Sequence, residues 1–472
     1  MCWEVNPVER NGSVQAWLET AGAQIRWRRA RRALLRELED HIADQARDFE
    51  ALGDGAGAAA ERAVAEMGDP TEVGKELDRL HRPRTNWSLL IAVLAVLGLG
   101  IAAMTLCLDG EYLLRRQLVA MGVGLAAMAA LWGADYSFFL RRLWLWGAPL
   151  LAFCVLTLCF PLWRGAVTPG RLSAFLGRGT FYVYLFLPLL YTALVCRLRG
   201  RGRLTAALAS LLIVPLALLP MSRPDFSTAL ICGASMLAVL TAAAWAGWFQ
   251  GGRTACLACA WGPVLGTAAA VLLRYGQYLV SRLTPIFRPE ADPLGKGWQA
   301  LLVRGALERM PLLGGTALTQ TEAQFFHPQG WSNGFDLLWL AARWGTWVLL
   351  AAGMLLAVLA LWAALRVRKL KSGTGKLLCW ACTSILLVQG AGYLSTNLGW
   401  RLFGAEAFPL LTYGPGYLLA DLVLVGIVLS VFRMDALVRD GAAERRTKAA
   451  MPGEVIIPLP FDRGKIRIER LK

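Results

Sequence analysis

From Trp87 onwards, long apolar runs alternate with short polar connections along the chain. Each run is close to the ~20 residues that an α-helix needs to cross the hydrocarbon core of a bilayer. The pattern predicts an all-α, polytopic membrane protein of about ten transmembrane helices. We expect them at residues 87–108, 118–139, 144–163, 181–196, 204–220, 226–249, 255–273, 337–365, 377–398 and 408–432.

Residues 14–81 show a different pattern, in which apolar residues recur at helical spacing among Arg, Glu and Asp. This is typical of amphipathic helices that pack into a small helical domain. Gly53–Gly57 interrupts the first helical stretch, which is one helix or two joined closely. A later helix is expected to start at Asp69, because Pro70 and Glu72 follow it in a capping-box arrangement.

Three regions follow from these patterns: a helical domain at 1–85, a membrane domain at 86–433 and a polar tail at 434–472. The end of the tail alternates apolar and polar residues around Glu454–Pro460 and Lys465–Leu471. This alternation predicts a short strand pair, and the alternative is a basic patch for anionic lipid.

Composition supports the membrane assignment, because 56% of the 472 residues are hydrophobic and 17% are charged. A net charge of +16 would suggest nucleic acid as the partner of a soluble chain, but here its placement favours a membrane reading. With the N-terminus inside, the short cytoplasmic loops hold 12 Lys and Arg residues and the opposite short loops hold 7. We therefore expect cytoplasmic N- and C-termini, no cleaved signal peptide, and an outward loop at 274–336.

Ten cysteines include two C-x-x-C pairs, Cys256 with Cys259 and Cys379 with Cys382. Both pairs lie in apolar runs with no His or carboxylate nearby in sequence to complete a zinc site. We expect these thiols to pack as small apolar residues, and we expect no metal site built from them.

The outward loop concentrates polar chemistry in an otherwise apolar chain, and four motifs in the membrane domain resemble one family. These motifs are Tyr112 with Arg115–Leu118, Pro224–Ala229, the stretch Tyr275–Gln299 with its Asp292-Pro-Leu-Gly295 core, and Phe408–Tyr417. In this order they resemble the SEDS family, which includes the RodA, FtsW and SpoVE proteins of bacterial elongation, division and sporulation. Separately, Leu35–Ile42 and Met67–Leu77 resemble the cytoplasmic prefix domain found ahead of many Gram-positive permeases, which implies regulation or partner docking. The alternative is a solvated helical extension that has no partner.

The SEDS resemblance implies a peptidoglycan glycosyltransferase in the bacterial plasma membrane. Such an enzyme polymerises lipid II, the undecaprenyl-linked precursor, usually with a class B penicillin-binding protein as its transpeptidase partner. The chemistry requires a carboxylate that deprotonates the attacking sugar hydroxyl. It also requires cations, either side chains or a divalent ion such as Mg²⁺, beside the departing pyrophosphate.

The chain departs from the family where that carboxylate is expected. In the segment His327–Asp336, the family's Asp position is occupied by Asn333 or Gly334. Asp336 lies three residues after Asn333, on the same face if the helix has already begun, and could replace the missing base. The alternative is that Asp336 caps the helix that begins at Leu337.

Other candidate residues have structural alternatives as well. Arg282 could bind a pyrophosphate through its planar guanidinium, or it could anchor the chain at the membrane interface. Asp292, Lys296 and Asn333 are further candidate substrate-binding residues of the SEDS-like segments. However, Asp292-Pro293 before Gly295 is also typical of a simple turn. Asp421 lies deep in the last span and needs a partner or a cavity there.

Two further departures bear on function. The fourth span has uncharged Phe181–Pro188 where the family has Gln-Pro-Ser-Glu and a Lys, and Tyr413–Tyr417 replaces the family's Tyr-Gly-Gly-Ser-Ser. Three hypotheses remain from the sequence: a lipid II polymerase, a catalytically degenerate partner that regulates a transpeptidase, and a flippase for the lipid-linked precursor.

Overall fold

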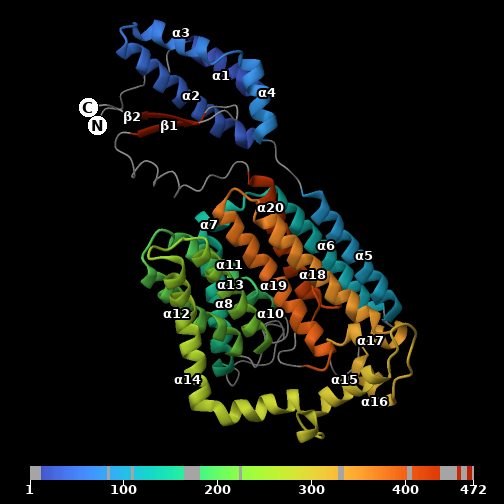
Figure 1. Ribbon diagram of the computed structural model, residues 1–472. Helices are drawn as coiled ribbons and strands as arrows, with labels where there is room; N and C mark the ends of the chain where they lie inside the picture. Colours follow the sequence, from blue (N-terminus) through green and yellow to red (C-terminus); the bar gives the residue numbers. More distant parts are fainter. Residues whose placement is uncertain are drawn as a thin grey trace. The chain divides into compact units, whose positions relative to one another are not determined.

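The computed structural model consists almost entirely of helices (Figure 1). It describes residues 12–81, 86–107, 111–163, 181–222, 226–327, 334–400, 407–435, 454–458 and 465–469. Two compact units can be separated, one of residues 1–85 with 433–439 and one of residues 86–432 with 440–472.

Four helices make up the N-terminal unit: α1 (Gly12–Gln24), α2 (Arg28–Ala51), α3 (Ala56–Glu66) and α4 (Pro70–His81). Apolar residues of α1, α2 and α3 form its core, which includes Trp17, Ile42 and Ala59. The Trp17 indole Nε1–H donates to the Gly68 carbonyl oxygen at 2.9 Å, which ties α1 to the turn before α4. The amphipathic pattern of the sequence therefore builds a closed helical core.

The membrane unit contains the helices that match the apolar runs of the sequence. They are α5 (Trp87–Cys107), α6 (Glu111–Gly133), α7 (Ser137–Arg141), α8 (Leu143–Trp163), α10 (Phe181–Tyr184), α11 (Leu187–Arg197), α12 (Arg203–Leu218), α13 (Phe226–Trp245), α14 (Arg253–Phe287), α18 (Trp347–Val367), α19 (Gly373–Asn397) and α20 (Pro415–Met434), with a 3₁₀ turn, η2 (Leu219–Ser222), after α12. Among the described residues, seven helices are long and apolar enough to cross a bilayer, and three further apolar helices are shorter. The all-α membrane fold is confirmed, while the number of ten spans stays a prediction.

The region predicted as a loop, residues 274–336, is largely helical in its described part. α14 continues to Phe287, with non-helical dihedral angles at Tyr275 (φ −125°, ψ 21°), and its second part turns away in Figure 1. It is followed by the 3₁₀ turn η3 (Pro289–Ala291), α15 (Trp298–Arg309) and α16 (Gln320–Phe326). The first helical part of α14 therefore ends at the kink at Tyr275, close to the predicted end of the seventh span near residue 273, and a second helical part follows to Phe287.

The predicted eighth span, 337–365, is divided in the structure. α17 (Asp336–Trp344) ends at Gly345, whose φ of 109° is unfavourable for residues with a side chain, and α18 starts at Trp347. A β-carbon at Gly345 would also collide with the Leu312 carbonyl oxygen. The chain after α15 packs into this break, because Thr346 N–H donates to the Pro311 carbonyl oxygen at 3.0 Å.

The outer helices and the spans share one apolar core. It joins Phe326 and Leu337 of α16 and α17 to Tyr393 of α19 and to Phe408 before α20. In the tail, β1 (Glu454–Pro458) pairs antiparallel with β2 (Lys465–Glu469), with Glu454 opposite Glu469. The tail thus contains the predicted strand pair.

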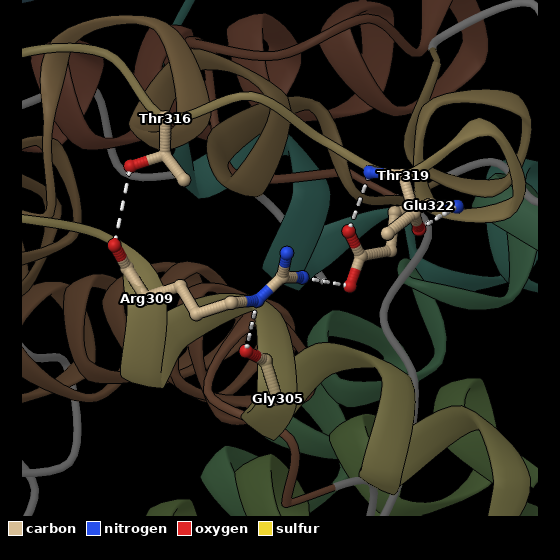
Figure 2. Close-up of polar contacts among 5 residues, drawn as sticks. All are labelled: Gly305, Arg309, Thr316, Thr319 and Glu322. Carbon is tan, nitrogen blue, oxygen red and sulfur yellow. Dashed lines mark hydrogen bonds and ion pairs between the residues drawn. The ribbon is translucent and has the colours of Figure 1, made fainter.

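An ion pair with a buried carboxylate joins α15 to α16 (Figure 2). Arg309 of α15 donates to Glu322 of α16, whose side chain is only 5% exposed. Glu322 also forms a capping box with Thr319, because its carboxylate accepts the Thr319 backbone N–H at 2.9 Å. Burial alone would raise the pKa of Glu322, but the hydrogen bonds from Thr319 and Arg309 outweigh it and lower the pKa.

We expect Glu322→Gln to lower the free energy of unfolding by about 1–3 kcal/mol, because a charge-assisted bond at a buried site is lost. The contribution of Glu322 is present above its ordinary pKa of 4.5 and disappears as the pH falls through the lowered folded-state pKa. Thermal melting of the purified protein measures both effects. The control is Glu308→Gln, which changes an exposed acid on α15 and should leave the melting midpoint unchanged.

Candidate functional site

The turn before α20, residues 407–414, is held by side chains that come from distant parts of the chain. Two of its backbone N–H groups donate to polar side chains of other helices: Tyr413 to Asp336 Oδ2 at 3.2 Å and Gly414 to Gln117 Oε1 at 3.2 Å. Within the turn, Phe408 N–H donates to Thr412 Oγ1 at 2.7 Å. Side chains therefore supply the acceptors that a regular helix would supply through its carbonyls.

The Gln117 side chain of α6 forms two hydrogen bonds with the turn. Besides accepting from Gly414, it donates through Nε2 to the Thr412 carbonyl oxygen at 3.4 Å. α5 also approaches closely, because a β-carbon at Gly100 would lie 2.6 Å from the Leu411 carbonyl oxygen. Two of the four motifs that resemble the SEDS family, the one at Arg115–Leu118 and the one at Phe408–Tyr417, thus meet in space.

Asp336 joins the turn to α17. It is the first residue of α17, and its carboxylate bonds the Tyr413 N–H of the turn, so this interaction crosses to another element instead of capping its own helix. Its backbone N–H donates to the Tyr393 hydroxyl at 3.1 Å. Burial raises the pKa of Asp336 to about 6, although the hydrogen bonds from Tyr413 and Tyr393 oppose the shift.

The start of α17 is capped from α19. Asn397 accepts the Leu338 N–H through Oδ1 at 3.0 Å and donates through Nδ2 to the Gly334 carbonyl oxygen at 2.9 Å. Asn397 and Tyr393 therefore satisfy the free N–H groups that the capping hypothesis assigned to Asp336. This arrangement leaves the Asp336 side chain available to other elements.

Of the two positions that can correspond to the family's Asp, only Gly334 is described, because Asn333 lies outside the described residues. Gly334 has a φ of 107°. A residue with a side chain would be strained there. If Gly334 is the corresponding position, its backbone has adapted to the loss of the carboxylate.

Asp292 and Lys296 lie in one turn. Lys296 N–H donates to Asp292 Oδ2 at 2.9 Å, and Lys296 Nζ lies 3.4 Å from the Ser281 carbonyl oxygen. β-Carbons at Gly295 and Gly297 would collide with this turn, which explains both glycines. In the described part of the chain, no hydrogen bond joins Asp292 or Lys296 to Asp336. Arg282 lies in α14, and its side chain is outside the described atoms.

Neither C-x-x-C pair forms a disulfide, since Cys256, Cys259, Cys379 and Cys382 are free thiols within α14 and α19. The part of the chain that the structure describes contains no group of three or more His, Cys, Asp or Glu side chains that could hold a metal ion.

Sequence reasoning missed the polar side chains that α19 contributes. Gln389, Tyr393 and Asn397 are four residues apart and so lie on one helical face. All three are buried, and Gln389 Nε2 donates to the Ala407 carbonyl oxygen at 3.2 Å. A stripe of hydrogen-bonding residues on a membrane span is a signal that could have identified this face.

Two departures from the family pattern contact each other. Tyr182, in the uncharged fourth apolar run, packs its ring against Gly416, where the family has a serine. A β-carbon at Gly416 would collide with that ring. The fourth apolar run and the last motif therefore pack directly against each other at this point.

We expect Gly416→Ser to lower the free energy of unfolding by about 1–3 kcal/mol, because the added atoms overpack the contact with Tyr182. Combining it with Tyr182→Ala should recover much of that loss, as a double-mutant cycle of melting curves would show. Additive effects of the two substitutions would contradict the contact.

Asp421 of α20 also forms a hydrogen bond with the 407–414 turn. It is 1% exposed and accepts the Leu410 N–H through Oδ2 at 3.3 Å. Leu410 has a φ of 62° and is the one described non-glycine residue with a positive φ. The Gln389 side chain lies beside Asp421, and the described residues give Oδ1 of Asp421 and Oε1 of Gln389 no other hydrogen-bond donor. Asp421 thus holds a strained turn residue with one oxygen only.

We expect Asp421→Asn to retain the melting midpoint or raise it, because the amide accepts from Leu410 and can donate to Gln389 without burying a charge. Asp421→Leu should lower the free energy of unfolding by about 1–3 kcal/mol, because the Leu410 N–H loses its acceptor. Thermal melting distinguishes the two variants. If both lower the midpoint equally, the carboxylate charge is required.

Known proteins of one family are similar to this chain in sequence and in fold. A family model described as "Cell cycle protein", for the FtsW, RodA and SpoVE proteins, matches residues 84–436. A probable peptidoglycan glycosyltransferase FtsW of Alkalilimnicola ehrlichii is 27% identical over 403 residues, which cover 79% of this chain and 94% of that protein. Its counterpart in Trichlorobacter lovleyi is 24% identical over 336 residues, covering 68% of this chain and 84% of that one.

A chain in a solved structure, described as "Structural coordination of polymerization and crosslinking by a peptidoglycan synthase complex", shares the fold. Its TM-score is 0.52 at 21% sequence identity, and the match covers 75% of this chain and 99% of that one. Because the family model spans well over half of the residues, this chain belongs to the SEDS family of FtsW, RodA and SpoVE cell cycle proteins.

Proposed function

We propose that this protein is a peptidoglycan glycosyltransferase that polymerises lipid II in cell-wall synthesis. The observation that carries the proposal is the position of Asp336, whose carboxylate lies at the junction of α17, α19 and the 407–414 turn. The relatives named probable peptidoglycan glycosyltransferases support it. A carboxyl group with a pKa raised to about 6 is suited to accept a proton near neutral pH.

In the proposed reaction Asp336 is the general base. Its carboxylate accepts the proton of the attacking sugar hydroxyl while that oxygen bonds to the anomeric carbon of the second lipid-linked sugar. The bond from that carbon to the undecaprenyl pyrophosphate breaks, and the pyrophosphate leaves with the electron pair. The Tyr413 N–H and the Tyr393 hydroxyl orient the carboxyl group.

The leaving pyrophosphate needs positive charge nearby. We propose Arg282 and Lys296 for this role, with Asp292 holding the Lys296 turn and Asn333 contributing a hydrogen bond to the substrate. Lys296 is exposed, whereas Arg304 packs its guanidinium carbon 4.5 Å from the Trp400 ring centroid and Arg309 is paired with Glu322. A divalent cation such as Mg²⁺ would be held largely by the pyrophosphate oxygens, which is its usual mode of binding.

We further propose that the protein acts in the bacterial plasma membrane with both termini in the cytoplasm and with a class B penicillin-binding protein as partner. The bias of Lys and Arg towards the predicted cytoplasmic loops supports this orientation. The similarity in fold to a chain of a peptidoglycan synthase complex supports a transpeptidase partner.

A second candidate function is a catalytically degenerate regulator of such a transpeptidase. The contact between Tyr182 and Gly416 favours it, because an aromatic ring packs beside the altered final motif where the family has charged and hydroxyl groups. In this case the chain would bind lipid II or the transpeptidase without transferring sugar.

The test is glycan-chain formation from labelled lipid II by the purified protein, with and without a class B transpeptidase. We expect Asp336→Asn to reduce polymerisation by at least about 100-fold, because a general base contributes roughly 10²–10⁴-fold. The wild-type rate should fall as the pH drops below about 6, where the base becomes protonated.

The matched control is Glu290→Gln, which changes an exposed acid of η3 and should leave polymerisation unchanged. Polymerisation that survives in Asp336→Asn would remove Asp336 from the mechanism. If the wild type forms no polymer under any condition and still binds lipid II, the regulatory function is favoured.

A further inference from the structure

The start of α2 concentrates positive charge on one side of a helix. Six arginines lie between Arg26 and Arg36, and the first acid after them is Glu37. Helical spacing places positions 28, 29, 32 and 36 on one face. We call these four positions the arginine stripe. The opposite face carries the buried residues Ala30, Leu34 and Leu38.

This placement works against the stability of the helix. The first turn of α2 contains no acidic residue, and its N-cap residue, Trp27, makes no side-chain capping bond. The N-terminus of a helix is the positive end of its macrodipole and favours acidic residues. Charges that are locally unfavourable are expected where a ligand compensates for them.

Two arginines of the stripe are available to an external partner. Arg32 and Arg36 are exposed, and neither makes an ion pair within the described part of the chain. The arginines outside the stripe are used internally. Arg31 donates to the Ile25 carbonyl oxygen at 3.0 Å, and the side chain of Arg26 lies 4.0 Å from Asp78.

The stripe belongs to the unit whose last helix, α4, is joined to the first apolar span by a short connection. The first turns of α2 pack against the end of α4, because Ala30 and Leu34 share a core with Leu77 and Arg26 N–H donates to Asp78 Oδ1 at 2.9 Å (Figure 1). Five residues, 82–86, connect α4 to α5, the first apolar span. An extended chain rises at most ~3.6 Å per residue, which limits this connection to about 20 Å.

We propose that the arginine stripe binds the headgroups of anionic phospholipids on the membrane face where α5 begins. Juxtamembrane arginines are attracted to anionic lipid headgroups within about a Debye length of the surface. The second half of α2 carries Asp40, Asp44, Asp48 and Glu50, so the same surface would repel it and orient the N-terminal unit.

The test uses the full-length protein in phosphatidylcholine nanodiscs that contain a phospholipid analogue with a photoactivatable headgroup. After illumination, mass spectrometry maps the cross-linked peptides. We expect the phosphatidylglycerol analogue to label residues 26–36 strongly and the phosphatidylcholine analogue to label them weakly, and high salt to abolish the difference. Arg32→Gln with Arg36→Gln should lower labelling by about fivefold per arginine.

The matched control is Arg47→Gln with Lys75→Gln, which removes two exposed positive charges elsewhere in the same unit and should leave labelling of residues 26–36 unchanged. Cross-links to the spans serve as the internal standard, and thermal melting verifies that each variant is folded. Equal labelling by both analogues, or labelling unaffected by the loss of Arg32 and Arg36, would overturn the proposal. Protection of the stripe by added RNA or by an acidic peptide, without lipid cross-links, would overturn it too.

Discussion

Irregular backbone at the end of membrane spans is stable only if its N–H and C=O groups find partners within the protein, and the 407–414 turn depends on this constraint. Its partners are single side chains, including Gln117 of α6, Asp336 of α17 and Asp421 of α20. Because each comes from a different helix, the turn fixes the relative positions of those helices. Loss of any one partner leaves a buried polar group unsatisfied. The packing of these helices and the polar site at the turn therefore depend on the same hydrogen bonds.

The departures of this chain from the family pattern are not independent of one another. A carboxylate and a lysine missing together from a buried span leave no stranded charge, which is the less costly change in a membrane. The space beside the last motif is filled by Tyr182, which requires glycine at position 416. The altered motif is therefore compatible with the close packing of Tyr182, which leaves no room for a side chain at position 416.

The order of the helices could be predicted because apolar runs of bilayer length are explicit in the sequence. The division at Gly345 could not be predicted, since the positive φ there accompanies a close tertiary contact with Leu312. Asp336 was identifiable as a carboxylate near the start of a helix. Its bond to Tyr413 is 77 residues distant in sequence, and nothing local to either residue indicates it.

The division at Gly345 also explains how a base could move along the chain without a new fold. α17 is a short helix whose start is fixed by Tyr393 and Asn397 of α19 and whose end is fixed by the break before α18. Asp336, in its first turn, is therefore held against the 407–414 turn. A carboxylate at the first position of α17 gains a backbone donor and the favourable end of the helix dipole, so the anion is supported at the place where the proposed base would accept a proton.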